Sequence, residues 1–97
     1  MATKKQIEEQ LRVYISVDDL DEVISNSVCI VIRETFTCWC YGQQEIKPNY
    51  YLIQHKITHR TILSELIKQN YKKNCSHLFY EGIQKTSDHF YEICWGS

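Results

Sequence analysis

A stretch of alternating residues, from Val28 to Tyr41, constrains the fold more than any other part of the chain. Every second residue in it is apolar except Glu34, and the residues between them are mixed in character. A period of two is typical of a strand with one face on a hydrophobic core. We therefore expect a central strand in which Glu34 marks a bulge or a bend. The apolar face consists of Val28, Ile30, Ile32, Phe36, Cys38 and Cys40.

A returning strand is expected after the central one. Residues 42–49 include Gly, Pro and Asn and predict a loop, whereas residues 50–57 have the composition of a strand. Pairing Tyr41 with Tyr50 then sets the register of a hairpin. The residues that this register gathers on the core side are Tyr51, Ile53, His55, Cys38 and Cys40.

Two short helices are expected before the central strand. Thr3 and Gln6 have the spacing of a capping box, which predicts a helix of about ten residues. The apolar face of this first helix comprises Ile7, Leu11 and Tyr14. Ser16 and the acidic residues that follow it indicate a second helix start. The apolar face of this second helix consists of Val17, Leu20, Val23 and Ile24, and the helix is expected to stop at Asn26.

The longest helix is expected after the returning strand. Thr58 or Thr61 caps its start, and the helix ends near Lys72. Its apolar stripe has helical spacing and consists of Ile62, Leu63, Leu66, Ile67 and Tyr71.

The chain ends in a predicted hairpin. Its strands are residues 77–84 and 89–95, and its register pairs Gln84 with His89. One face then carries Leu78, Tyr80, Tyr91, Ile93 and Trp95, and the other carries Phe79, Ile83, Phe90 and Cys94. Both faces are rich in apolar groups, so one can cover the core helix while the other needs a second cover, for which a partner chain is the simplest candidate.

These elements predict the order helix, helix, strand, strand, helix, strand, strand in one domain of residues 1–97. An antiparallel sheet with the helices packed on one face makes an α+β fold. A chain of 97 residues buries only about 60–65% of its unfolded surface. Such a small domain often gains stability by pairing with a copy of itself.

Charge and composition bound the function. Eleven Lys and Arg residues against twelve Asp and Glu residues give a formal net charge of −1, which argues against a general nucleic-acid binder. No apolar run approaches the roughly 20 residues of a membrane span, and the N-terminus lacks the apolar region of a secretory signal. Five cysteines without an export signal predict reduced thiols and a cytoplasmic location.

The composition also indicates an AT-rich genome. The chain has one alanine, Ala2, one proline, Pro48, and three glycines, beside many residues with AT-rich codons. An AT-rich bacterium, a protist or a large cytoplasmic DNA virus fits this bias. In the last case we expect an accessory or virion protein.

A zinc-stabilised module is one alternative. Cys38 and Cys40 share a strand face, and His55 and His59 follow on the returning strand, which together make a donor set that zinc accepts. The C-x-C spacing departs from the usual zinc knuckle, and free Cys commonly behaves as a small buried apolar side chain. We therefore expect packed thiols and no cofactor.

A nucleic-acid-binding accessory protein is the other alternative. Aromatic rings on a sheet can stack on bases, and Lys72, Lys73 and Lys85 can contact phosphates. The aromatic residues alternate with aliphatic and carboxylate side chains, however, as core and interface residues do.

The sequence favours an interaction module over an enzyme. It contains no glycine-rich phosphate loop, no G-x-S-x-G and no H-E-x-x-H. Seven tyrosines and two tryptophans are instead typical of residues that anchor interfaces. We expect a non-enzymatic protein that forms a homodimer through the terminal hairpin. The predicted interface residues are Tyr80, Tyr91, Trp95, Leu78 and Ile93.

Overall fold

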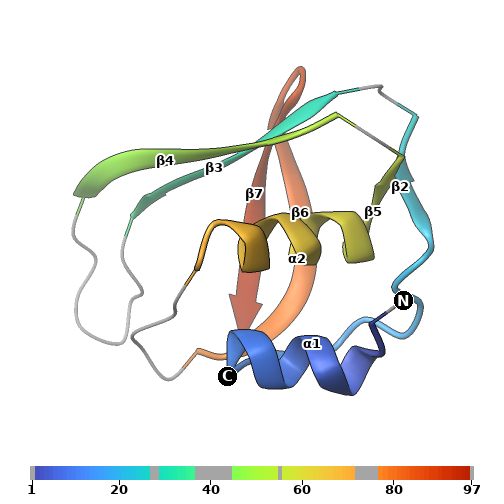
Figure 1. Ribbon diagram of the computed structural model, residues 1–97. Coiled ribbons are helices and arrows are strands. Elements are labelled where there is room, and N and C mark those ends of the chain that lie inside the picture. Colours follow the sequence, from blue (N-terminus) through green and yellow to red (C-terminus); the bar gives the residue numbers. More distant parts are fainter. Residues whose placement is uncertain (1, 27–28, 37–44, 55, 72–76, 97) are drawn as a thin grey trace.

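The computed structural model describes residues 2–26, 29–36, 45–54, 56–71 and 77–96. In these residues two helices lie against a curled five-stranded sheet of mixed strand direction, and a second sheet has two strands (Figure 1). The predicted α+β class is confirmed. The prediction of a third helix and of a purely antiparallel sheet is wrong.

The first helix begins where the sequence predicts. Helix α1 spans Lys4–Leu11. The hydroxyl of Thr3 accepts the backbone N–H of Gln6 at 3.2 Å, and the Gln6 side chain accepts the N–H of Thr3 at 2.8 Å. This is the expected capping box, which satisfies two helix donors at once. Ile7 is buried on the face toward the core, as predicted.

The helix ends at Arg12, whose φ of 58° is left-handed. Strand β1, Tyr14–Ile15, follows directly. The prediction that Tyr14 continues the apolar face of the helix is wrong. In the strand Ile15 is buried and Tyr14 points the other way, with 56% of its surface exposed.

The predicted second helix does not form. Residues 16–22 are irregular, and strand β2, Val23–Ser25, occupies the expected helix end. The Asp19 carboxylate accepts the backbone N–H of Asp21 at 2.9 Å. A side chain that bonds its own backbone two residues later stabilises a turn in competition with a helix.

The central hairpin is present in a different register. Strand β3 spans Ile30–Phe36, strand β4 spans Glu45–Ile53, and Arg33 lies opposite Tyr50. The prediction had placed Tyr41 there, eight residues further along the chain. Because eight is an even number, the two faces of the hairpin are nevertheless as predicted.

The details of the hairpin follow from this register. Tyr51 and Ile53 are buried on the core side, as expected. The register shifts between Glu34 and Phe36, which confirms the predicted irregularity at Glu34. The segment 42–49 was expected to be a loop, but β4 already begins within it. Cys38, Cys40 and His55 lie outside the described residues.

Helix α2, His59–Lys68, follows the short strand β5, Ile57–Thr58. Thr58 is the N-cap and makes a capping box with Thr61. Of the two residues predicted as the cap, Thr58 and Thr61, Thr58 is the one that caps the helix. The helix stops at Lys68, before the predicted end near Lys72. The helix residues that are buried are His59, Ile62, Leu63 and Leu66.

Removing the cap of α2 is expected to weaken the fold. Thr58→Ala leaves the backbone N–H of Thr61 without its acceptor, which is 3.2 Å away in the structure. We expect a loss of about 1 kcal/mol in the free energy of unfolding, measured by urea denaturation. Ser64→Ala, at an exposed position inside the same helix, is the control, and an equal loss in both variants would contradict the capping role.

The chain ends in the expected hairpin. Strand β6 spans Phe79–Ser87 and strand β7 spans Phe90–Gly96. Tyr80 lies opposite Trp95, two residues from the predicted partner, because the register shifts twice along the hairpin. The two-residue displacement again keeps the faces in place at this end.

The order of strands in the large sheet is β1-β6-β7-β3-β4. The pairs β3–β4 and β6–β7 are antiparallel, whereas β1–β6 and β3–β7 are parallel. The parallel pairs arise because the chain crosses over through α2 between the two hairpins. Figure 1 shows α2 inside the curl of the sheet and α1 below it, where α1 packs against α2.

Candidate functional site

The predicted interface residues lie on the inner side of the terminal hairpin. Tyr80 is fully buried and Tyr91 is 9% exposed, and both belong to the core cluster. Trp95 stacks on Tyr71 with 6.0 Å between ring centroids, and Ile93 packs against the same core. The chain therefore covers these four side chains largely by itself. Leu78, the fifth, is half-buried beside α1.

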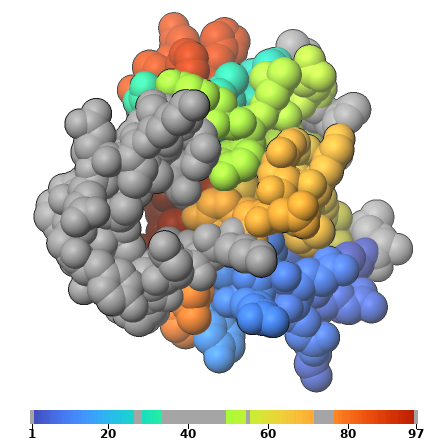
Figure 2. Space-filling model, turned by 60° about the vertical axis from the view of Figure 1, so that its left-hand side comes forward, coloured from blue at the N-terminus to red at the C-terminus, as the bar shows by residue number. Residues whose placement is uncertain are grey.

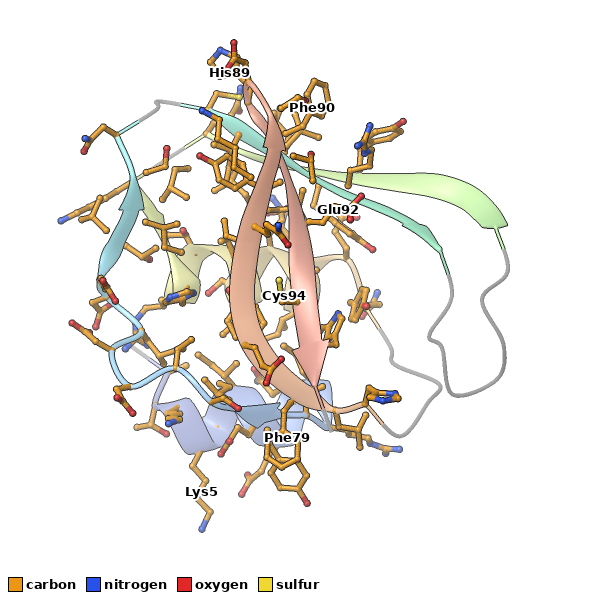
Figure 3. The ribbon with its side chains drawn as sticks, turned by 180° about the vertical axis from the view of Figure 1, so that it is seen from behind. Lys5, Phe79, His89, Phe90, Glu92 and Cys94 are labelled. Carbon is orange, nitrogen blue, oxygen red and sulfur yellow. The ribbon has the colours of Figure 1, made fainter. Side chains whose placement is uncertain are left out.

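The outer face of the sheet carries most of the exposed large apolar side chains of the described residues. Among the described residues, four of the five exposed large hydrophobic side chains lie there. They are Tyr14, 56% exposed, Tyr50, 58%, Leu52, 48%, and Phe79, 38%. Figure 3 shows this face from behind the molecule, with the β6–β7 hairpin in front and both helices beyond it.

Strand alternation could have identified this face. Each exposed residue is the neighbour of a buried one, as Tyr50 is of Tyr51 and Phe79 is of Tyr80. For β4 the predicted faces already separated Tyr50 from the core. For β1 the signal was hidden, because Tyr14 also fits the helical spacing of the residues before it.

The two ends of the outer face differ. Tyr14 and Phe79 stack on one another with 5.0 Å between centroids, so each ring covers part of the other. At the other end, Tyr50 and Leu52 lie on the edge strand β4. Within the described part of the chain, no ring stacks on Tyr50.

Charged groups occupy the centre of the outer face. The Arg33 Nε lies 3.8 Å from Glu92 Oε1, and both side chains are partly exposed. The guanidinium carbon of Arg33 also lies 5.7 Å from the centre of the Phe90 ring, a cation–π geometry. A half-exposed ion pair contributes little to stability, but it places both signs of charge beside the exposed apolar residues of β4.

Cys94, on β7, is one of the two described free cysteines and is labelled in Figure 3. Burial raises the pKa of the Cys94 thiol, and the carboxylates of Glu81 and Glu92 raise it further. A raised pKa keeps the thiol protonated at neutral pH, whereas a nucleophilic cysteine needs a lowered pKa. Cys94 is therefore poorly suited to covalent catalysis.

A buried pair of rings links α2 to the sheet. His59 Nδ1 lies 2.9 Å from Tyr80 Oη, and His59 is 8% exposed. Burial lowers the pKa of His59 below its usual 6.5, against the opposing effect of Glu22 and Asp19. Burial also raises the pKa of the Tyr80 hydroxyl, and the nearby Cys94 thiol raises it further. At neutral pH both groups are uncharged, and their hydrogen bond holds the start of α2 against β6.

His59 makes the fold sensitive to acid. The unfolded chain has a His59 pKa near 6.5 and the folded chain a lower one, so the unfolded state binds more protons below pH 6.5. The stability is fully present above this pH and falls as the pH drops, by at most about 1.4 kcal/mol per pH unit for one proton.

Urea unfolding at pH 7.5 and 5.5 measures this effect. We expect His59→Gln to lower the stability at pH 7.5 but to reduce its pH dependence, because the titrating group is gone. His77→Gln, at a half-buried histidine outside the core cluster, is the control. Equal pH dependence in the wild type and in His59→Gln would contradict the assignment.

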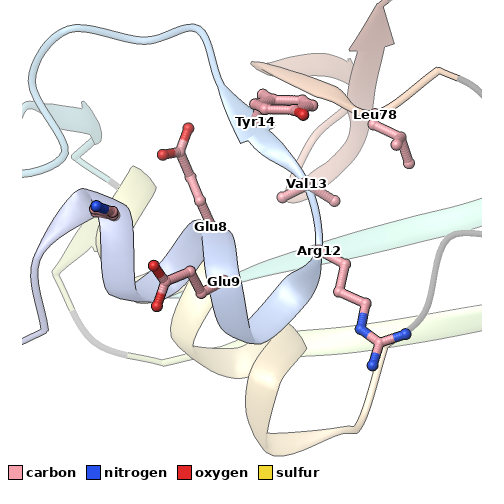
Figure 4. A pocket seen from close by; sticks show the side chains of 7 residues that line it. Glu8, Glu9, Arg12, Val13, Tyr14 and Leu78 are labelled. Atoms are coloured by element: carbon pink, nitrogen blue, oxygen red, sulfur yellow. The ribbon is translucent and has the colours of Figure 1, made fainter.

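A shallow pocket of about 350 Å³ lies between α1 and β1. Figure 4 shows Glu8 reaching from α1 toward β1, where its carboxylate accepts the backbone N–H of Ile15 at 2.8 Å. The lining residues are Lys5, Glu8, Glu9, Arg12, Val13, Tyr14 and Leu78. Two cations and two carboxylates balance one another here, so the lining selects no particular ligand charge.

The other predicted ligands are not brought together in the described residues. Of the four zinc candidates only His59 is described, and it bonds Tyr80. The described ranges contain no group of three His, Cys, Asp or Glu residues that could hold a metal ion. Lys85 lies 3.6 Å from Asp88, while Lys72 and Lys73 lie outside the described residues.

The structure contains no described helix that is both long and apolar enough to cross a membrane. No model of a known protein family matches the chain, and no curated protein or solved structure is significantly similar to it.

Proposed function

We propose that this protein is a non-enzymatic interaction module that self-associates as a homodimer. The observation that carries the proposal is the exposure of Tyr50 and Leu52, which are 58% and 48% exposed on an edge strand. Exposed apolar residues gathered on one face mark interaction surfaces. Tyrosine is suited to such a surface because it buries much area while its hydroxyl keeps a polar contact.

The charges beside this patch favour a second copy as the partner. Arg33 and Glu92 place a cation and an anion next to each other on the same face. In a two-fold dimer the same patch meets itself, so a patch with both signs of charge can be self-complementary. A partner with one dominant charge, such as a nucleic acid, gains little electrostatic attraction from this patch, because the patch carries both signs and the chain has a net charge of −1.

The absence of a catalytic role is part of the proposal. It is supported by two of the described groups that could serve as nucleophile or base. The thiol of Cys94 has a raised pKa, and the imidazole of His59 is buried in a hydrogen bond with Tyr80. The origin in an AT-rich virus, as an accessory or virion protein, stays a prediction from composition.

Sedimentation velocity over a concentration series tests the proposal. We expect the weight-average sedimentation coefficient to rise between about 1 and about 200 µM, as a reversible monomer–dimer equilibrium requires. A coefficient that stays at the monomer value throughout would contradict self-association. The same series is repeated with a single-stranded oligonucleotide. If the protein and the oligonucleotide sediment together, and less so at higher salt, the nucleic-acid alternative is supported instead.

A further inference from the structure

The direction of the backbone groups in β3 can be derived from a contact with β7. The N–H of Val31 donates to the carbonyl of His89 at 2.7 Å, at the start of β7. In a strand the N–H and C=O of one residue point to the same side, and the side alternates from residue to residue. Since Val31 faces β7, its neighbours Ile30 and Ile32 direct their backbone groups to β4.

The register between β3 and β4 determines the direction of the backbone groups in β4. Ile32 lies opposite Tyr51 and Ile30 opposite Ile53, so these are the pairs that exchange hydrogen bonds between β3 and β4. The residues between them, Tyr50 and Leu52, therefore direct their N–H and C=O groups away from β3. In the described part of the chain β4 is the last strand of its sheet, so these groups face an open edge.

At the opposite edge of the sheet, an acidic side chain covers β1. The N–H groups of Tyr14 in β1 and of Ser16 just after it donate to the carbonyls of Leu78 and Tyr80. The intervening N–H of Ile15 faces outward, and the Glu8 carboxylate accepts it at 2.8 Å. A charged side chain that covers an edge donor prevents another strand from pairing there. β1 covers only Phe79 and Tyr80 of β6, and the rest of β6 carries a positive φ at Gly82 and two register shifts. Of the two edges in the described sheet, β4 is thus the one better suited to regular pairing.

We infer that two copies of this chain pair through their β4 strands, antiparallel and about a two-fold axis at Tyr51. This inference rests on the proposed self-association and specifies its geometry. Tyr50 then lies opposite Leu52 of the partner subunit, and Leu52 opposite the partner's Tyr50. Each of these pairs exchanges both of its backbone hydrogen bonds, and the two sheets become one continuous sheet.

The neighbouring registers make fewer of these bonds. An axis at Tyr50 brings Leu52 opposite the partner's Pro48, which has no N–H to donate. An axis at Leu52 brings Tyr50 opposite the partner's Gln54, which lies beyond the end of β4. Of these three axes, only the one at Tyr51 pairs both Tyr50 and Leu52 with residues inside the strand that have an N–H.

The side chains support the same register. Tyr50 and Leu52 are the exposed large hydrophobic residues of β4, and each would cover the other across the axis. Figure 2 shows the atoms of β4 at the surface beside those of α2. A single strand edge buries less than the roughly 800 Å² per partner of a typical interface. We therefore expect a weak dimer, with a dissociation constant of about 10 to 100 µM.

Charge substitutions test the register. Tyr50→Lys and Leu52→Glu each remove an apolar partner, and each is expected to raise the dissociation constant about tenfold or more. In the double variant the introduced ammonium lies opposite the partner's introduced carboxylate, so dimerisation should return to within a few-fold of the wild type. A mixture of the two single variants should likewise form a heterodimer more tightly than either alone.

Tyr14→Lys is the matched control, because Tyr14 is 56% exposed on β1, at the opposite edge of the sheet. It should leave the dissociation constant unchanged, and circular dichroism checks that every variant is folded. Dimers that persist in Tyr50→Lys and Leu52→Glu would overturn pairing through β4 while leaving self-association intact. Weakening in both single variants without recovery in the double variant would overturn the register. A wild type that stays monomeric would overturn the proposed function itself.

Discussion

Leu63→Ala is expected to lower the free energy of unfolding by about 2 to 5 kcal/mol. Leu63 lies in α2, the helix inside the curl of the sheet, and none of its surface is exposed. Truncation removes buried methyl groups and leaves a cavity, which the surrounding sheet can only partly close. A small domain has a total stability of only about 5 to 15 kcal/mol, so the variant should be close to unfolding at physiological temperature.

Leu52→Ala is the matched control for this prediction. It makes the same chemical change at a residue that is 48% exposed on the outer face. Urea denaturation at about 1 µM protein, where the dimer is dissociated, compares the two variants. The control should lose less than about 1 kcal/mol. Similar losses in both would contradict the placement of α2 as the centre of the core.

Gly82→Ala is expected to cost about 1 to 3 kcal/mol, because the residue has a φ of 109°, where only glycine is unstrained. An added Cβ would also lie 3.4 Å from Cε1 of His59. This is a close van der Waals contact with the ring that bonds Tyr80. The substitution should therefore lower the stability and change the NMR titration of the His59 ring together.

Gly96→Ala is the corresponding control. Its added Cβ would meet the carboxylate of Glu81, the end of a flexible, exposed side chain that can move away. Comparing the thermal unfolding of both variants distinguishes backbone strain at Gly82 from a steric cost that any added Cβ on the β6–β7 hairpin would cause. If Gly96→Ala proves as destabilising as Gly82→Ala, the strain argument fails.

The features that the sequence predicted correctly depend on neighbours along the chain. The capping boxes at Thr3 and Thr58 need only residues three positions apart, and the alternation in the central strand is read in one segment. The partners in the β3–β4 hairpin were predicted on the correct faces even though the register was displaced. Side chains alternate between the two faces of a strand, so a register displaced by an even number of residues leaves every side chain on its predicted face. The displacement in the β3–β4 hairpin is eight residues, which is even. In the terminal hairpin this holds for Tyr80 and Trp95, but the prediction for Ile83 is wrong, because a register shift brings it opposite Ile93 and against the core.

The features that were missed depend on contacts between distant segments. The parallel pairing of β1 with β6 joins Tyr14 to Phe79, and that of β3 with β7 joins Val31 to Phe90. No local pattern encodes these pairs. The absent second helix has a similar cause, because Leu20 is buried by the tertiary fold while Val23 pairs with Thr58 in the small sheet.

The same limitation explains why the exposed surface could not be located from the sequence. The sequence has apolar residues on both strands of the terminal hairpin, but the curl of the sheet around α2 determines which of them are enclosed. Tyr80 and Tyr91 fall on the enclosed side. The exposed residues of the outer face come from strands far apart in the chain, so their proximity became visible only with the order of strands.

Hydrogen exchange resolved to single amides distinguishes a free β4 edge from a paired one. We expect the amides of Tyr50 and Leu52 to exchange more slowly at about 1 mM than at about 10 µM protein, because the dimer provides them with hydrogen-bond acceptors. The amide of Tyr51, which bonds β3, should be protected equally at both concentrations. Exchange rates of Tyr50 and Leu52 that do not change with concentration would contradict the pairing of two copies through β4.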